Sequence, residues 1–241
     1  MSPAARPDRD LELALLADHE LVGGLDEVGR GALAGPVSVG LAVVSRSTAD
    51  SFPPGLADSK QLSPSRRRAL VGPCRGWLAD HAVAHASPTE IDALGIVGAL
   101  RLAGRRALAE VASRGRAPDI VILDGASDWL SAPEPDPTAA SDERAQAAST
   151  SRPDATASTP PVRTEVKADA RCAVVAAASV LAKVERDALM AALPDPGYDW
   201  AANKGYAAPA HVQALRALGA CEQHRLSWRL PGLGRHRRPR G

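Results

Sequence analysis

Cysteine is rare in this 241-residue chain, and the three cysteines, Cys74, Cys172 and Cys221, stand far apart. Their odd number and wide spacing match neither a disulfide framework nor a zinc-binding motif. The N-terminus also lacks the apolar core of a secretion signal, and no apolar run is long enough to cross a membrane. We therefore expect a cytoplasmic protein with reduced thiols and no membrane association.

Lysine is scarce too, since the chain has 25 arginines but only four lysines. A lysine ammonium is a compact point charge that a planar guanidinium does not replace. A chain that avoids lysine is therefore expected to keep it where that property is used. The four lysines are Lys60, Lys167, Lys183 and Lys204. All of them fall in the segments singled out below.

The net charge of +1 favours no class of partner by itself, but the charge is unevenly distributed. Residues 131–162 carry a net charge of −3, so the remainder carries +4. Basic clusters lie at 66–68, 101–116 and 225–240. Such clusters suit a phosphate backbone, although plain solubility explains any single one equally well.

Residues 131–162 interrupt an otherwise ordinary globular sequence. Of these 32 residues, 23 are Ala, Pro, Ser or Thr, and no hydrophobic periodicity survives. We predict a disordered or loosely held insertion. The rest of the chain divides into a polar lead over 1–20, a folded domain over 21–230 that contains the insertion, and a basic tail over 231–241. From Arg225 onward the chain is expected to be poorly ordered.

Hydrophobic periodicity predicts an α/β domain. Strands are expected where short apolar runs end in turn residues, and they cover 21–28, 36–45, 81–86 and 119–124, with a short strand near 163–167. Helices are expected over 64–80, 96–111, 170–192 and 209–218. Gly72-Pro73 should kink or split the first helix. Asp169 stands where an N-cap of the third helix belongs.

The most informative stretch runs from residue 22 to 37. An apolar strand ends in Asp26 and Glu27, and the glycine-rich loop Gly29-Arg30-Gly31 follows at once. Two adjacent carboxylates are costly to crowd together unless a cation shares them. The glycines let phosphate or sugar oxygens approach the backbone N–H groups of the loop. An isolated Asp–Glu pair is more often a solvated turn, so carboxylates elsewhere decide between the two interpretations.

Two further carboxylates close ordered segments. Asp124 ends the strand 119–124, and Asp169 lies at a junction between strand and helix. An α/β sheet is able to bring these two and the Asp26–Glu27 pair to one edge. Oxygen ligands suit Mg²⁺ or Mn²⁺, and two such ions about 4 Å apart stabilise the attacking and leaving oxygens of phosphodiester hydrolysis. Because strand neighbours point to opposite faces, the pattern favours Asp26 as the bridging ligand, with Glu27 reaching the site through the turn.

Residues 24–37 closely resemble the signature of type 2 ribonucleases H, specifically the bacterial ribonuclease HII family. They read Gly-Leu-Asp-Glu-Val-Gly-Arg-Gly, then Ala, then Leu-Ala-Gly-Pro-Val. Further blocks follow in that family's order, and they cover 58–63, 123–125, 167–170, 177–187, 203–206 and 224–228. The resemblance spans about 21–230. Several spaced blocks in one order make a chance similarity implausible.

The resemblance implies a ribonuclease H-like α/β fold, with a mixed five-stranded sheet flanked by helices and a helical C-terminal part. It implies an endonuclease that hydrolyses the RNA strand of RNA–DNA hybrids. It also implies a cut on the 5′ side of a single ribonucleotide embedded in duplex DNA, which leaves 3′-hydroxyl and 5′-phosphate ends. Nothing in this activity requires more than a monomer.

The same resemblance assigns site residues. Four positions match the family's catalytic, metal-binding carboxylates, which would hold two Mn²⁺ or Mg²⁺ ions, and they are Asp26, Glu27, Asp124 and Asp169. The loop of Gly29, Arg30 and Gly31 matches the part that reads the 2′-hydroxyl. Tyr206 matches the tyrosine that packs on the nucleotide at the junction. Positions near the phosphates are matched by Lys60, Ser179 and Lys183.

One departure concerns the segment after Tyr206. The family usually has a threonine there, ahead of the helix, and this chain has Ala207-Ala208-Pro209 instead. The lost N-cap costs about 1 kcal/mol of helix stability, partly offset by Pro209 at the first helical position.

Two alternatives stay open on the sequence alone. The sister ribonuclease HIII shares the fold, but it typically carries threonine in place of Arg30 and has an extra N-terminal substrate domain. A catalytically weak hybrid-binding protein is the second alternative. The presence of all four carboxylates argues against it, because unused clustered acids repel a phosphate backbone.

Overall fold

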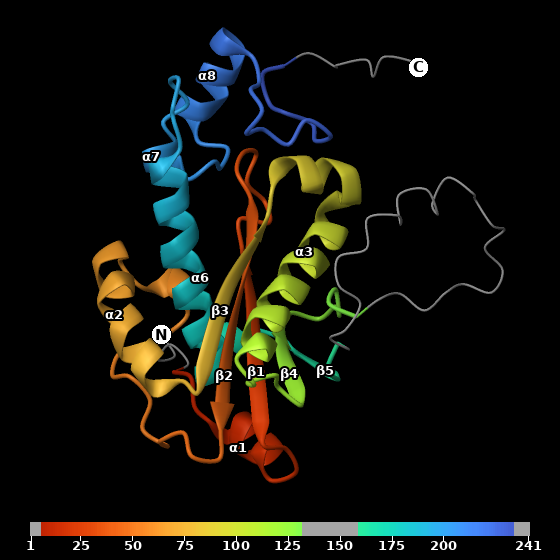
Figure 1. Cartoon of the computed structure of the whole chain (residues 1–241). Coiled ribbons are helices and arrows are strands. Elements are labelled where there is room, and N and C mark those ends of the chain that lie inside the picture. The colour runs from red at the N-terminus through yellow and green to blue at the C-terminus, as the bar shows by residue number, and fades with distance from the viewer. Residues whose placement is uncertain (1–5, 132–158, 234–241) are drawn as a thin grey trace, which may run out of the picture.

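The structure, a computed structural model, describes residues 6–131 and 159–233. The predicted disorder of the insertion therefore falls almost entirely outside the described residues, as does most of the basic tail. At the centre lies a five-stranded sheet in the order β3-β2-β1-β4-β5 (Figure 1). The strands are β1 (Leu21–Val28), β2 (Val37–Ser45), β3 (Asp80–Ala86), β4 (Ile120–Asp124) and β5 (Val162–Glu165). The first three pair antiparallel, and β1, β4 and β5 pair parallel, which confirms the expected mixed sheet.

Helices cover both faces of this sheet. They are α1 (Asp10–Leu16), α2 (Pro64–Trp77), α3 (Pro88–Ser113), α5 (Ala168–Arg171), α6 (Ala173–Ala192), α7 (Trp200–Asn203) and α8 (Pro209–Leu218), with a 3₁₀ turn over Ser59–Gln61. Figure 1 shows α3 on one face, α6 and α2 on the other, and α7 and α8 beyond the tip of the β1–β2 hairpin. None of the described helices has the length and apolarity that a membrane span requires.

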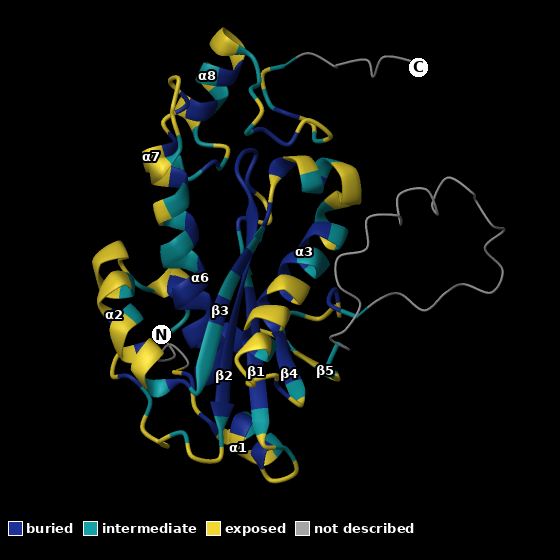
Figure 2. Ribbon diagram, viewed as in Figure 1, coloured by how far each residue is buried: buried dark blue, intermediate teal, exposed yellow. Residues whose placement is uncertain are grey.

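The central strands β2, β1 and β4 are mostly buried and dark in Figure 2, whereas β3 is buried only at alternate positions and β5 is partly exposed. Leu25, Leu41 and Leu123 pack in the cluster with α3, whereas Val22 and Ile122 pack in the cluster with α6. Alternation along each strand therefore separates two cores. Even-numbered residues of β1 and β4 face α6, which places Asp26 and Asp124 on that face.

Two glycines let α6 lie directly against the sheet. A Cβ at Gly24 would stand 2.8 Å from the backbone of Val174, and one at Gly40 would clash with the carbonyl oxygen of Ala178. The residues Ala176, Ala177 and Ala178 of the helix are fully buried at this contact, so neither side has room for a larger group. This close approach brings the polar residues of α6 to the strand ends.

Three predicted helix details are wrong. The helix α2 runs unbroken through Pro73, because Leu70 and Cys74 beside it are buried and their packing offsets the lost hydrogen bond. The predicted helix over 170–192 is divided at Cys172, whose backbone is extended. Asp169 lies inside the first turn of α5, and the cap position belongs to Lys167, which adopts a left-handed conformation at φ 59°.

The N-terminal segment is packed into the domain. Glu12 of α1 is fully buried and accepts a hydrogen bond of 2.6 Å from the backbone N–H of Val174, at the start of α6. Arg9 pairs with Glu12 at 3.1 Å. Burial raises the pKa of Glu12 to about 7, and the contacts with Val174 and Arg9 oppose that rise. The side chain of Glu12 thus accepts from a backbone N–H in the first turn of α6, where a helix has free N–H groups.

The helix–sheet contact generates a stability prediction. Gly40→Ala should destabilise the protein by about 1–3 kcal/mol, because the new methyl group meets backbone that is unable to move away. Gly76→Ala is the matched control, since Gly76 is exposed in α2 and a Cβ there meets nothing within 4 Å; it should stabilise the protein by about 0.5–1 kcal/mol. Urea unfolding of both variants measures the difference. Equal stabilities would contradict the tight contact.

Candidate active site

Two carboxylates of the site come from adjacent parallel strands. Leu25 of β1 pairs with Leu123 of β4, so Asp26 and Asp124 follow side by side at the same level of the sheet. Neighbouring strands lie about 4.8 Å apart, and both side chains leave the face that α6 covers. The Oδ1 atom of Asp124 accepts a hydrogen bond of 2.7 Å from the N–H of Ala168, which ties the end of β4 to the start of α5.

The third carboxylate reaches the same place through the short helix α5. Asp169 is 4% exposed, and its Oδ2 atom lies 3.1 Å from the Nζ of Lys60. Lys60 comes from the 3₁₀ turn, whose N-cap Asp58 accepts the Lys60 N–H at 2.8 Å. The turn therefore holds one of the chain's few ammonium groups against the carboxylate.

The fourth carboxylate, Glu27, leaves the opposite face of β1. Its Oε1 atom lies 3.2 Å from Nη1 of Arg30, so the turn of the glycine loop folds back on the strand end. Burial raises the pKa of Glu27, and the Arg30 guanidinium opposes that rise. The charge of Asp124 raises the pKa further, which shows that Glu27 stands within electrostatic reach of the other carboxylates.

Asp26 is the centre of the acidic group. Burial raises its pKa to about 8, the Ser179 hydroxyl opposes the rise, and the charges of Glu27, Asp124 and Asp169 add to it. The pKa of Asp169 is also raised, by burial and by Asp124, against the lowering effect of Lys60. Asp26, Glu27 and Asp169 are thus penalised by neighbouring carboxylates, the situation in which a shared cation is most favourable.

The donor set fits hard divalent ions. Every candidate ligand is a carboxylate oxygen, the type that Mg²⁺ and Mn²⁺ prefer. Among the described residues, no three His, Cys, Asp or Glu side chains are drawn together as a finished metal site. The Lys60 ammonium, beside Asp169, is the positive charge that the structure places at these carboxylates.

Two fully buried arginines hold the loop 29–36. The guanidinium of Arg225 donates to the carbonyl oxygens of Gly29 at 2.6 Å, Arg30 at 2.8 Å and Gly35 at 3.2 Å. The segment from Arg225 was expected to be poorly ordered, and over the described residues 225–233 that prediction is wrong. The carbonyls of the loop have no strand partner, so they draw this arginine into the interior.

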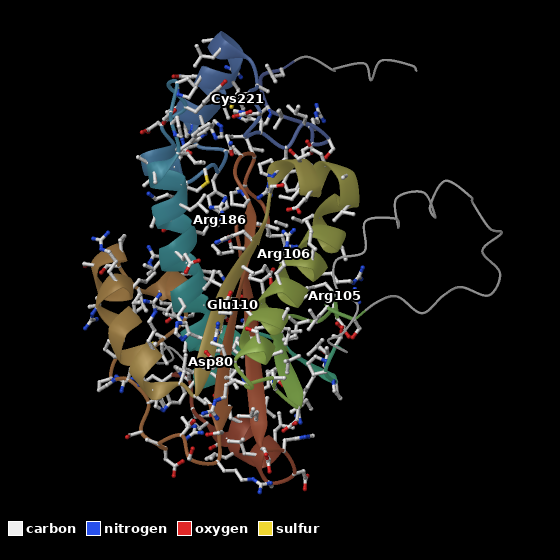
Figure 3. All side chains as sticks on the ribbon, in the orientation of Figure 1. Asp80, Arg105, Arg106, Glu110, Arg186 and Cys221 are labelled. Atoms are coloured by element: carbon white, nitrogen blue, oxygen red, sulfur yellow. The ribbon has the colours of Figure 1, made fainter. Side chains whose placement is uncertain are left out.

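Arg186 does the same from α6. It donates to the carbonyl oxygens of Pro36 at 2.9 Å, Lys204 at 2.9 Å and Ala34 at 3.3 Å. Figure 3 shows Arg186 on the stretch of α6 beside the hairpin tip. Gly29 has a φ of 83°, and a Cβ there would collide with the Arg186 guanidinium, so the first glycine of the loop is required by both backbone and packing.

The predicted substrate-binding residues form two groups. Ser179 lies beside Asp26 and donates its hydroxyl hydrogen to Ser59 Oγ at 2.8 Å, so it joins Lys60 at the carboxylates. One turn further along α6, the Lys183 Nζ donates to Asp187 at 2.7 Å and lies 5.9 Å from the centre of the Tyr206 ring. The structure therefore places Tyr206 at the loop and not at the carboxylates themselves.

Sequence reasoning missed four buried residues at this end of the molecule. They are Arg186, Arg225, His211 and His224. Arginine is almost always exposed, so a basic residue near a basic tail is naturally interpreted as surface charge. Their position inside the blocks 177–187 and 224–228 was the available signal for Arg186, His224 and Arg225.

Comparison with known proteins identifies the family. The family model of ribonuclease HII matches residues 23–230. The chain belongs to the ribonuclease HII family. Ribonuclease HII of Streptomyces avermitilis is 42% identical over 230 residues, which cover 94% of this chain and 85% of that protein. This assignment favours the HII branch over the sister HIII branch.

Solved structures show the same fold. Ribonuclease HII of Archaeoglobus fulgidus, solved in complex with PCNA, superposes with a TM-score of 0.58 at 25% identity, covering 87% of this chain and 96% of that one. Bst ribonuclease HIII in complex with Mn²⁺ superposes with a TM-score of 0.55 at 21% identity, covering 87% of this chain and 67% of that one. The second likeness concerns the fold alone.

Burial of Asp26 generates a pH prediction. Its folded pKa of about 8 lies above the ordinary value of 3.8, so its contribution to stability is full below about pH 4 and is lost as the pH rises through 8. In EDTA at pH 8, Asp26→Asn should therefore raise the free energy of unfolding by on the order of 2 kcal/mol. Urea unfolding at pH 5 and pH 8 tests this; a difference that does not grow with pH would contradict it.

The Arg225 contacts generate a second prediction. Arg225→Lys should destabilise the protein by about 2–4 kcal/mol, because an ammonium is unable to span three carbonyl groups and leaves some of them buried without donors. Arg229→Lys, at an exposed position four residues on, should change stability by less than about 0.5 kcal/mol. Thermal unfolding of the pair measures both. A harmless Arg225→Lys would show that the loop does not depend on this guanidinium.

Proposed function

We propose that this chain, a hybrid-cleaving endoribonuclease of the ribonuclease HII family, also cuts on the 5′ side of single ribonucleotides embedded in duplex DNA and leaves 3′-hydroxyl and 5′-phosphate ends. The observation that carries the proposal is the placement of Asp26 and Asp124 on adjacent strand ends, with Asp124 bonded to the start of α5 next to Asp169, beside a glycine loop clamped by two buried arginines. One part of this arrangement suits phosphodiester hydrolysis, and the other suits recognition of a sugar.

The acidic group would hold two divalent ions, Mg²⁺ or Mn²⁺. Asp26 is the proposed bridging ligand because it lies deepest and feels the charges of the other three carboxylates. Asp124, Asp169 and Glu27 would complete the ligand set from β4, α5 and the far face of β1. Bound there, divalent ions supply Lewis-acid stabilisation of the attacking and leaving oxygens in phosphodiester hydrolysis.

The chain's own cations would orient the phosphates. Lys60 has a side chain that is 72% exposed, and it already stands 3.1 Å from Asp169 at the edge of the acidic group. Lys183 lies on the adjoining surface of α6, beside Asp187. A phosphate placed between them would be held by compact point charges, which fits the chain's sparing use of lysine.

The glycine loop would distinguish RNA from DNA. Gly31 has open space where a Cβ would stand, so a sugar is able to approach the backbone there. Arg225 and Arg186 occupy the carbonyl groups of the loop from inside, which leaves its outer side free to contact a 2′-hydroxyl. The ring of Tyr206, flanked by Lys183 and Arg186 at 5.9 and 5.6 Å, would pack on the nucleotide at the junction.

Removing one carboxylate tests the catalytic half of the proposal. Asp124→Asn should lower the cleavage rate by more than about 100-fold, because losing a mere hydrogen-bond partner of a metal ligand already costs about 10–100-fold and Asp124 is a proposed ligand itself. Binding of the duplex should stay the same or improve because a negative charge is gone. Asp18→Asn, at an exposed site at the far end of β1, should cleave at the wild-type rate.

The substrates should be a labelled DNA duplex with one ribonucleotide, an all-DNA duplex and a long RNA–DNA hybrid, each with Mg²⁺ or Mn²⁺. A cut just 5′ of the single ribonucleotide and none in the all-DNA duplex is the expected result. An unchanged rate in Asp124→Asn would overturn the metal site. Binding without any cleavage by the wild type would favour the hybrid-binding alternative.

A further inference from the structure

A chain of hydrogen bonds runs through the interior and ends at Tyr206. The backbone N–H of Cys221 donates to Nδ1 of His224 at 3.1 Å. The Nε2 atoms of His224 and His211 lie 3.0 Å apart, and Nδ1 of His211 lies 2.8 Å from the carbonyl oxygen of Tyr206. The carboxylate site uses neither histidine, and both are buried, with exposures of 0% and 1%.

The two ends of this chain determine the protonation of both rings. A backbone N–H donates only, so Nδ1 of His224 accepts and the ring hydrogen of neutral His224 is on Nε2. That hydrogen points to Nε2 of His211, which must accept. His211 then carries its hydrogen on Nδ1 and donates it to Tyr206, whose carbonyl oxygen accepts only. The Cys221 Sγ atom also lies 3.3 Å from Nδ1 of His224, where its thiol is a weak donor to the accepting nitrogen. One arrangement of hydrogens satisfies all these contacts.

Aromatic rings surround the buried pair. The Tyr198 ring packs edge-on against both histidines, with centroids 4.7 Å from His224 and 5.9 Å from His211. Trp200 stacks on Tyr198, and its ring centroid lies 6.1 Å from that of His224. Burial and the neighbouring His211 lower the pKa of His224 to about 4. In such an environment a hydrogen bond is stronger and an unmade one is costlier.

Backbone contacts hold the chain on the N-terminal side of Tyr206: its N–H donates to the carbonyl oxygen of Asn203 at 3.0 Å, and the Gly205 carbonyl accepts from the N–H of Leu33 at 2.8 Å. On the C-terminal side the contacts are fewer. The helix α8 begins at Pro209 with Ala208 as its N-cap, and no side chain caps it, as the sequence predicted. Besides His211, the Tyr206 carbonyl accepts only the N–H of Ala208 at 2.8 Å. The buried histidine of the first turn thus does the anchoring that a capping hydroxyl would share.

The segment that carries His224 also holds the glycine loop. Ala34 pairs with His224 as an isolated bridge, the Gly35 N–H donates to the carbonyl of Gln223 at 2.8 Å, and Arg225 follows with its three carbonyl contacts. The short segment 223–225 therefore contacts the glycine loop directly, and it contacts Tyr206 through the rings of His224 and His211.

We propose that His211 and His224 are positioning residues that fix Tyr206 relative to the glycine loop, and so set the preference for a lone ribonucleotide over a long hybrid. This inference rests on the proposed function, because it assumes that Tyr206 contacts the nucleotide. Neither histidine touches substrate. The effect acts on the ratio of kcat/KM for the two substrates, which a purely structural role would leave unchanged.

Side-chain amides test the proposal, because asparagine places its nitrogen near Nδ1 of a histidine and glutamine near Nε2. At 211, asparagine keeps the donor to Tyr206 and should hold the ratio within about twofold of wild type, whereas glutamine removes it and should lower the ratio about tenfold. At 224 the order reverses, because glutamine keeps the donor to His211 and asparagine loses it. We therefore expect His224→Asn to lower the ratio about threefold.

Reciprocal preference at the two positions is the supporting result. Equal behaviour of both amides at each site, or a fall in melting temperature with an unchanged ratio, would reject the positioning role. Nitrogen-15 NMR of the wild type at pH 7 gives a test without any variant: His224 should carry its hydrogen on Nε2 and His211 on Nδ1. The opposite tautomers would overturn the inference even if no variant folds.

Failure of the proposed function looks different. A wild type that does not cut at a single ribonucleotide rejects that function, and Tyr206→Ala with an unchanged ratio rejects the role of the tyrosine. If the wild type cuts and Tyr206→Ala loses the preference while His211→Gln keeps it, only the histidine inference falls.

Discussion

The hydrogen bonds from two buried guanidinium groups to main-chain carbonyl oxygens are the interaction on which the glycine loop and its surroundings depend. The loop 29–36 leaves the sheet, so its carbonyl groups have no strand partners, and Arg186 and Arg225 satisfy them from inside. A buried charge is tolerated because each guanidinium has several fixed donors and meets several acceptors. Burial lowers the pKa of Arg225 to about 10, still well above neutrality, so the group stays charged.

The acidic site works under the opposite constraint. Arginine charge is matched by carbonyl dipoles, but the carboxylates at the strand ends are matched only in part, by Lys60 and Arg30. The raised pKa values of Asp26, Glu27 and Asp169 mean that their ionised forms destabilise the folded protein, through burial and through like charges held close together. Such a site trades stability for affinity toward cations, which is a common property of functional sites.

A single helix, α6, connects the two arrangements. Its alanines lie against Gly24 and Gly40, which sets its distance from the sheet. At that distance Ser179 reaches the carboxylates and, two turns further on, Arg186 reaches the loop. The strand-end carboxylates and the glycine loop are therefore both held by this helix, and a shift of the helix would disturb both together.

Local pattern determined the sheet strands and most helices, because periodicity and capping residues are written along the chain. The proposal of four site carboxylates came from their places at segment ends and from the family resemblance of the spaced blocks. Only the tertiary structure decided that Cys172 divides a helix, that Pro73 does not, and that Arg225 and His224 are interior. The reason is physical: a sequence shows which residues carry charge, but whether a charge is buried depends on acceptors contributed by residues nearly 200 positions away, as Gly29 is from Arg225.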